Sequence, residues 1–170
     1  MLRPVSTSLI ALALTACVAP GDTPDAALSS IDYSLTPCFG FCPAFSLSVD
    51  ADGTGKYNGQ AFVKQRGTSV FSASPEEVAA FVERIAPYRP EDSVSYGYEN
   101  CDGPVATDSP TVTITWHEAG EKPVTLQWYM GCRQPGLADN SEALYDAWRE
   151  LPVEGLVGNN EDRRTYGGFD

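Results

Sequence analysis

Apolar and polar residues alternate along several segments of this chain. A period of two is the pattern of a β-strand that buries one face and exposes the other. The clearest runs are residues 45–49, 112–116 and 124–130. The last two flank a turn around Gly120, so we expect them to pair as neighbouring antiparallel strands.

Turn signals place two hairpins in the first half of the chain. The Asp-Gly pair at 52–53 turns the first run into a return strand, and the Arg-Gly pair at 66–67 breaks a later apolar segment in the same way. The expected strand pairs are 45–49 with 54–58 and 61–65 with 68–72. Phe62 and Phe71 are the aromatic residues that the second hairpin offers to the core.

Two segments have apolar residues at i, i+3, i+4 and i+7, the spacing of an amphipathic helix. The first begins with the capping residue Ser74, followed by a proline at the first helical position and by Glu77 three residues after the cap. This helix is expected to stop near Ala86. The second is expected to open at 139–142 and to end before Pro152.

The order of these elements predicts an α+β fold. We expect a single antiparallel sheet of about five or six strands with two helices packed on one face. Residues 88–110 show neither period and contain three prolines, so they are expected to form a long irregular loop that Cys101 pins to the domain.

The first sixteen residues are expected to be a processing segment. One basic residue, Arg3, precedes an apolar stretch that is too short to span a bilayer. The stretch ends in Leu-Thr-Ala-Cys at 14–17, which resembles a bacterial lipobox. The resemblance implies that the Cys17 sulfur receives a diacylglycerol and that Cys17 becomes the first residue of the mature chain. The alternative is an ordinary secretory signal in which the cysteine occurs by chance.

A lipobox makes the membrane an expected partner, through N-terminal acyl chains such as palmitate. Two or three acyl chains hold a protein stably on a bilayer, whereas one chain does so only marginally. Resemblance to Gram-negative lipoproteins further implies that Val18 permits export to the outer membrane. We therefore expect a lipid-anchored protein of the bacterial cell envelope, held at the outer membrane and facing the periplasm.

Changes in composition mark the boundaries of the remaining segments of the chain. Residues 18–29 contain two prolines and two aspartates without periodicity, which is typical of a tether, and the last residues are rich in glycine, asparagine and charge. The expected segments are a leader at 1–16, the lipidated cysteine with its flexible tether at 17–29, the α+β domain at 30–152 and a loosely ordered tail at 153–170.

Four cysteines remain once Cys17 is acylated, an even number in an oxidising compartment. Of the three possible pairings we favour Cys38–Cys42, which share one tight loop, and Cys101–Cys132, which flank strands expected to be neighbours. A redox pair or half of a zinc site is the rival interpretation of the first pair. It is disfavoured because the spacing is C-x3-C and no Lys, Arg or His lies beside it to activate a thiol.

Charge and motifs narrow the possible functions. The chain has 170 residues with 11 Lys+Arg against 23 Asp+Glu, a formal net charge of −12. This balance disfavours the basic surface that nucleic-acid binding needs, so no nucleic-acid partner is expected.

The sequence contains no phosphate-binding glycine loop, dinucleotide fingerprint or nucleophile motif. A calcium loop could start at Asp50, but Ala61 stands where a bidentate glutamate is needed. We assign no cofactor, no metal and no catalytic residue.

Few side chains remain that could carry acid–base chemistry. His117 is the only imidazole, and its place at the end of a predicted strand is typical of an exposed surface histidine. The acidic pairs that could act on a glycan are Asp50 with Asp52 and Asp102 with Asp108. Such pairs in turns usually serve turn hydrogen bonds and solvation.

The segment from Pro37 to Pro43, Pro-Cys-Phe-Gly-Phe-Cys-Pro, is followed by Asp-Gly-Thr at 52–54 and by Tyr-Asn-Gly at 57–59. This combination resembles a bacterial family described as domain of unknown function 6438, whose members share a Pro-Cys-Phe-Gly-x-Cys-Pro segment followed by an Asp-Gly hairpin. The resemblance extends through the Ser74 helix to the last helix. It implies a shared domain without implying an activity.

These observations favour a non-enzymatic binding or structural module. Its possible contact surface comprises Phe39 and Phe41 in the short cysteine loop and Tyr96 and Tyr98 in the long loop, since tyrosine is favoured in binding surfaces. The partner would be an envelope protein or a glycan. The alternatives are a small envelope hydrolase acting on cell-wall or glycan material and, third, a thiol-redox protein.

Overall fold

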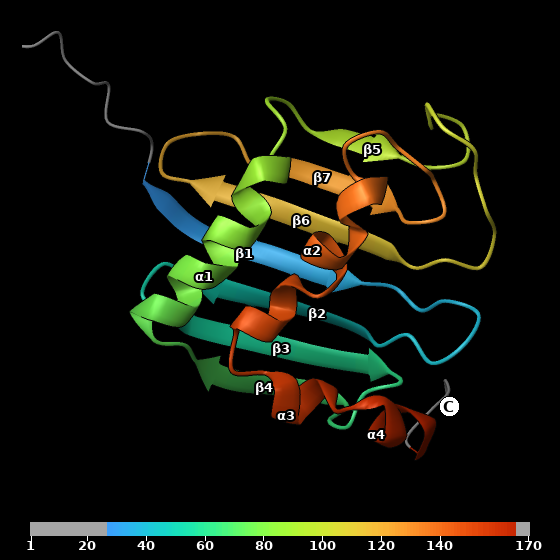
Figure 1. The fold of residues 1–170 in the computed structure, drawn as a ribbon. Coiled ribbons are helices and arrows are strands. Elements are labelled where there is room, and N and C mark those ends of the chain that lie inside the picture. Colours follow the sequence, from blue (N-terminus) through green and yellow to red (C-terminus); the bar gives the residue numbers. More distant parts are fainter. Residues whose placement is uncertain (1–26, 166–170) are drawn as a thin grey trace, which may run out of the picture.

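A single seven-stranded sheet organises the molecule, described here from a computed structural model for residues 27–165 (Figure 1). The strands are β1 (Leu28–Leu35), β2 (Ala44–Asp50), β3 (Thr54–Ala61), β4 (Gly67–Ser72), β5 (Val94–Tyr96), β6 (Thr111–Glu118) and β7 (Val124–Tyr129). Their order across the sheet is β4-β3-β2-β1-β6-β7-β5, and all neighbours pair antiparallel except β5, which runs parallel to β7. The α+β class with one sheet is confirmed, although the sheet is mixed and has more strands than the five or six expected.

Strand β1, at the centre of the sheet, is not among the predicted strands. It pairs with β2 on one side and with β6 on the other. Ile31, Tyr33 and Leu35 form its buried face. Its first residue, Leu28, lies inside the segment expected to be a tether, because the residues before it have the composition of a linker. The stability of β1 comes from pairing with the distant β6, which local sequence does not show.

The predicted pairs β2–β3 and β6–β7 are confirmed, whereas the second predicted hairpin is wrong in its first strand. β3 continues to Ala61, the chain turns at 62–66, and β4 pairs with β3 itself. Phe62 takes a positive φ of 53° in this turn and packs edge-on against Phe41. Phe71 enters the core as expected.

The helices gather on one face of the sheet, where α1 crosses the strands (Figure 1). They are α1 (Pro75–Ile85), α2 (Ser141–Tyr145), α3 (Glu154–Val157) and α4 (Asn160–Thr165), with short 3-10 helices η1 (Ala86–Tyr88), η2 (Ala138–Asn140) and η3 (Ala147–Glu150). The predicted start of α1 is confirmed. The Ser74 hydroxyl accepts from the Glu77 N–H (3.2 Å), and the Glu77 carboxylate accepts from the Ser74 N–H (2.7 Å), a reciprocal cap that fixes where the helix begins.

The second predicted helix is divided into α2 and η3. Two side chains bind carbonyls at the end of α2, where the Asp146 N–H still donates to the Glu142 carbonyl (3.0 Å). The Tyr33 hydroxyl donates to the carbonyls of Leu144 (2.9 Å) and Tyr145 (2.8 Å). The Arg84 guanidinium donates to the carbonyls of residues 142 and 143. These bonds dock the end of α2 on the central strand and on α1.

The segment after η3 is packed more closely than the loose tail that its composition predicted. Val153 and Val157 are fully buried. The backbone N–H groups of Lys64 and Gln65 donate to the carbonyls of Val157 and Leu156. α3 and the residue before it therefore contribute two valines to the core beside the β3–β4 turn. The glycine-rich and charged composition of this segment gave no sign of this packing.

No helix within residues 27–165 is long and apolar enough to cross a bilayer. The predicted leader, Cys17 and all but the last residues of the tether lie outside the described residues. The lipid anchor accordingly stays a prediction.

Replacing Tyr33 by Phe should lower the free energy of unfolding by about 1–2 kcal/mol, because the carbonyls of Leu144 and Tyr145 lose the hydrogen bonds of the hydroxyl while the ring packing is kept. Urea denaturation measures the change. Tyr88→Phe is the matched control, since Tyr88 is half-buried and its hydroxyl makes no hydrogen bond to another described residue. An equal loss in both variants would contradict the docking role of the Tyr33 hydroxyl.

The same variant tests a pH dependence. Burial raises the pKa of Tyr33 well above its ordinary value. The unfolded chain therefore loses this proton first, so stability is fully present below about pH 10 and falls as the pH rises above it. Tyr33→Phe should show a smaller fall above about pH 10 in urea titrations, whereas identical profiles would mean that the buried phenol does not titrate differently in the folded chain.

Candidate functional site

Within residues 27–165 the helices lie on one face of the sheet, and the outward residues of the other face are exposed or half-buried. Successive side chains of a strand point to opposite faces, and on the central strands the members that avoid the core are small and polar. On these strands the outward residues are Ser30, Asp32, Ser34, Ser46, Ser48, Thr111, Thr113 and Thr115. We call the surface that they and their neighbours on the outer strands form the open face.

Strand register aligns the open-face residues into a row that crosses all seven strands. Each member stands opposite the next on the neighbouring strand. From β4 to β5 the row reads Thr68, Asn58, Ser46, Ser34, Thr113, Gln127 and Ser95. Every member is uncharged and both donates and accepts hydrogen bonds. At about 4.8 Å between strands this polar row spans about 29 Å.

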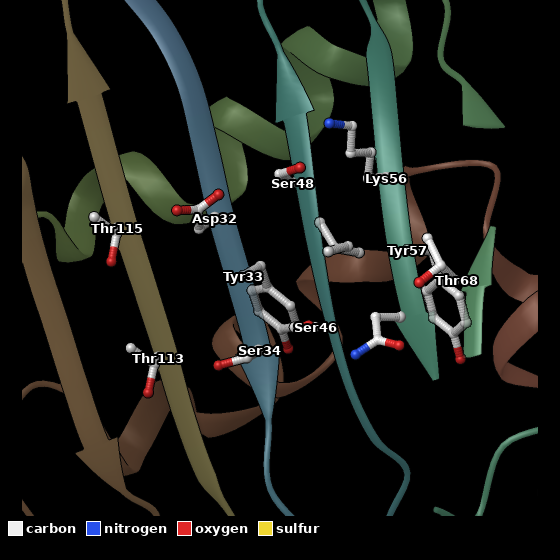
Figure 2. A pocket seen from close by; sticks show the side chains of 12 residues that line it. Asp32, Tyr33, Ser34, Ser46, Ser48, Lys56, Tyr57, Thr68, Thr113 and Thr115 are labelled. Carbon is white, nitrogen blue, oxygen red and sulfur yellow. The ribbon is translucent and has the colours of Figure 1, made fainter. Parts of the chain in front are cut away.

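The open face is hollowed near its middle, where a shallow depression of about 560 Å³ lies over β1, β2 and β3 with β6 at its rim. Figure 2 shows Ser34 and Ser46 toward one end of the hollow, and Asp32, Ser48 and Lys56 toward the other. The hollow exists because β1 and β2 carry serines here, whose side chains fill little space.

The hollow holds one charged residue of each sign. Asp32 on β1 and Lys56 on β3 share a register line, with Ser48 between them on β2. The Asp32 carboxylate also lies 2.8 Å from His117 Nε2. His117 lies one residue before the end of β6, as predicted, and its side chain is 33% exposed. The charges of Asp32 and Lys56 offset each other, so the hollow lacks the acidic excess of the whole chain.

Two stacked tyrosines stand at the β5 end of the polar row. The rings of Tyr98 and Tyr129 are 4.8 Å apart between centroids and 27° from parallel. The Tyr129 hydroxyl donates to the Ala106 carbonyl (3.0 Å), so it accepts the hydrogen bond that joins it to the Tyr98 hydroxyl (2.9 Å). Donating this bond stabilises the neutral phenol and raises the pKa of Tyr98. Tyr98 is 62% exposed, so its ring stacks on Tyr129 and also faces solvent.

Two disulfides hold the loops at the end of the sheet where β1 and β7 finish, and they are the favoured pairs Cys38–Cys42 and Cys101–Cys132. The second ties the long loop to the chain just after β7. The Gln134 side chain adds to this tie, since it accepts from the Asp102 N–H (3.1 Å) and donates to the Asp102 carboxylate (2.7 Å).

The predicted contact residues lie in the short disulfide loop and at the end of β5. Phe39 is 89% exposed at the tip of the short disulfide loop, and its N–H donates to the Asp108 carbonyl of the long loop (3.1 Å). Phe41 is 53% exposed in the same loop. These residues share one end of the sheet with Tyr98, whereas Tyr96 packs against the core.

The acidic residues considered for acid–base chemistry make hydrogen bonds within loops. The Asp52 carboxylate accepts from the Thr54 N–H (2.8 Å) in the β2–β3 turn, and this bond lowers the pKa of Asp52. Asp108 accepts from the Thr107 hydroxyl (3.1 Å). In the part of the chain that the structure describes, no cluster of His, Cys, Asp and Glu could hold a metal ion.

Sequence reasoning missed the polar row. Serine, threonine and asparagine at alternate strand positions were a visible signal, but alternation alone does not distinguish a binding face from a solvated one. The row also crosses β1 and β5, which were not predicted, so its continuity appears only in the assembled sheet.

Residues 29–151 match the model of a family described as a domain of unknown function (DUF6438). The chain belongs to the DUF6438 family. The match runs from β1 to the residue after η3, so the DUF6438 domain includes the whole sheet and both disulfides and excludes α3 and α4. The resemblance first seen around the short cysteine loop is thereby confirmed. Comparisons with curated proteins and with solved structures found no match.

Removing the two disulfides in turn should show that the larger loop matters more. The loop-entropy relation gives about 3.7 kcal/mol for the 31-residue separation of Cys101→Ala/Cys132→Ala and about 2 kcal/mol for the 4-residue separation of Cys38→Ala/Cys42→Ala. Denaturant unfolding measures both losses. Near-ultraviolet circular dichroism should lose the tyrosine-stack signal in the first variant alone, and its retention there would contradict the bracing role of Cys101–Cys132.

Proposed function

We propose that this chain is a lipid-anchored protein of the bacterial cell envelope, and that its DUF6438 domain is a disulfide-stapled module that binds a glycan chain across the open face. The observation that carries the proposal is the unbroken polar row, seven uncharged hydrogen-bonding side chains that cross the whole sheet. The envelope location is supported by the lipobox-like sequence ending at Cys17 and by the two disulfides, which persist in oxidising compartments.

A glycan chain matches the row in chemistry and in shape. Sugar hydroxyls both donate and accept hydrogen bonds, as do the hydroxyl and amide groups of the row. The row is about 29 Å long, which accommodates several sugar units laid across the strands. The hollow over β1 to β3 gives room for a ring near the middle of that path.

The tyrosine stack adds the apolar contact that sugar binding uses. A sugar ring presents C–H groups on one face, and these pack on the electron-rich face of an aromatic ring. Tyr98 offers such a face beside Gln127 and Ser95, the last members of the polar row. Its support by Tyr129 and by the disulfide-tied loop limits the entropy lost on binding.

Other partners fit the open face less well. The centre of a protein interface usually has apolar or aromatic anchors, and the polar row has none. A nucleic acid needs a basic surface to neutralise phosphates, whereas the one cation in the hollow, Lys56, is offset by Asp32.

A hydrolase acting on cell-wall or glycan material is the second candidate, and the contact between His117 and Asp32 is the observation in its favour. A histidine–carboxylate pair activates a hydroxyl only when the other ring nitrogen faces that hydroxyl. Among the described residues, no serine, threonine or cysteine side chain hydrogen bonds to His117. Binding therefore remains the better-supported function of this face.

Ser46→Arg should weaken glycan binding at least about tenfold, because the long side chain fills the hollow and interrupts the polar row. The full chain in mild detergent is sedimented with purified peptidoglycan sacculi, and the bound fraction is measured against sacculus concentration. Ala79→Arg is the matched control, since Ala79 is an exposed small residue on α1, at the opposite face. It should bind as the wild type does.

Two results would contradict this proposal. One is a wild-type chain that stays in the supernatant with sacculi and also with chitin and cellulose. The other is equal binding by Ser46→Arg and Ala79→Arg, which would mean that the contact lies outside the open face.

Intact mass of the wild-type chain from a membrane fraction tests the anchor. The mature chain should begin at Cys17 and carry two or three acyl chains, because the lipobox cysteine is the acylated residue. Cys17→Ala should carry none, and Ser6→Ala, a change elsewhere in the leader, should leave acylation intact. An unmodified mature chain in the wild type would contradict the anchor without affecting the proposed glycan site.

A further inference from the structure

Strand β4 forms one edge of the sheet, and within the described residues it pairs only with β3. The first residue after the strand shows which backbone groups of β4 point toward β3. The Ala73 N–H donates to the Gly53 carbonyl (2.9 Å), which continues the register in which Phe71 faces Gly55. Because backbone groups alternate in direction along an antiparallel strand, the N–H and C=O groups of Thr68, Val70 and Ser72 point away from β3.

This edge lacks the features by which natural sheets prevent pairing with another strand. The sequence of β4, Gly-Thr-Ser-Val-Phe-Ser, contains no charge and no proline, and its pairing with β3 shows no bulge. Val70 is 78% exposed, the most exposed aliphatic side chain among the large apolar residues of the described chain. The chain as a whole has a net charge of −12, whereas this edge strand carries no charge. This difference points to a partner strand.

We infer that the edge of β4 pairs with β4 of a second copy of this chain, antiparallel about a two-fold axis at Val70. In that arrangement Val70 faces its own copy, and Thr68 faces Ser72 of the second chain. Three facing pairs of outward residues give about six interchain hydrogen bonds. The two Val70 side chains meet beside the axis, which buries the exposed apolar surface.

Charge complementarity favours a second copy over an unrelated strand. Lys64 lies three residues before β4 and Glu76 four residues after it, in the first turn of α1, and both are exposed. Antiparallel pairing about Val70 brings the basic end of each strand toward the acidic end of the other, so the edge is complementary to itself. The open faces of the two seven-stranded sheets would then lie on the same side of the dimer, with the two Val70 side chains between them. This inference does not depend on what the open face binds.

Native mass spectrometry of the full chain, released from detergent at micromolar concentration, tests the pairing. The wild type should have the mass of two chains. Val70→Pro removes one outward N–H without removing a bond to β3, so it should leave the fold intact and reduce dimer affinity at least about tenfold. Val70→Thr is the matched control: it keeps the backbone donor and the branched side chain, and should remain dimeric. A urea melt of each variant verifies folding.

The charge complementarity is tested separately. Lys64→Glu should weaken the dimer about two- to fivefold, as expected for exposed ion pairs, and Lys64→Glu/Glu76→Lys should restore it. The inference would be overturned by a wild type that stays monomeric at tens of micromolar chain, or by a Val70→Pro dimer as strong as the wild type. A dimer weakened equally by Val70→Thr and Val70→Pro would also overturn it. That result would mean that contact between side chains, and not backbone pairing, holds the dimer together.

Discussion

The fold depends on the burial of β1 between β2 and β6. This strand is hydrogen bonded on both sides, and its pairing with β6 joins the first part of the chain to the second. Tyr33 extends the same constraint to the helical layer, since its hydroxyl binds the last carbonyls of α2. Sheet centre and helix docking are therefore set by one strand, and a loss of β1 would separate the sheet and also free α2 from it.

Local patterns predicted the elements whose signals lie within a few residues. The Ser74 cap, the Asp-Gly turn and the alternation in β6 and β7 are all short-range, and each was confirmed. The missed or altered elements depend on distant partners. β1 is stabilised by β6, β5 by a parallel contact with β7, and the break after Tyr145 by a hydroxyl from the other end of the chain. The polar row belongs to the same class, because only strand register aligns its members.

The two disulfides act at one end of the sheet and give its loops a defined shape. Cys38–Cys42 closes the loop that follows β1, and the Phe39 N–H joins that loop to Asp108 in the long loop. Cys101–Cys132 then ties the long loop to the end of β7, beside the stacked tyrosines. The aromatic platform of Tyr98 is consequently built on covalently braced segments, although the loop itself has little regular structure.

The open face and the edge of β4 recognise ligands by different chemistry. The face offers side chains, whose identity and spacing select what lies across them, whereas the edge offers backbone groups, which accept any extended strand unless charges discriminate. Pairing two edges would place two polar rows in one surface. A long glycan crossing both would then bind its second site intramolecularly, so that modest hydrogen bonding at each row would yield a much stronger attachment of the pair.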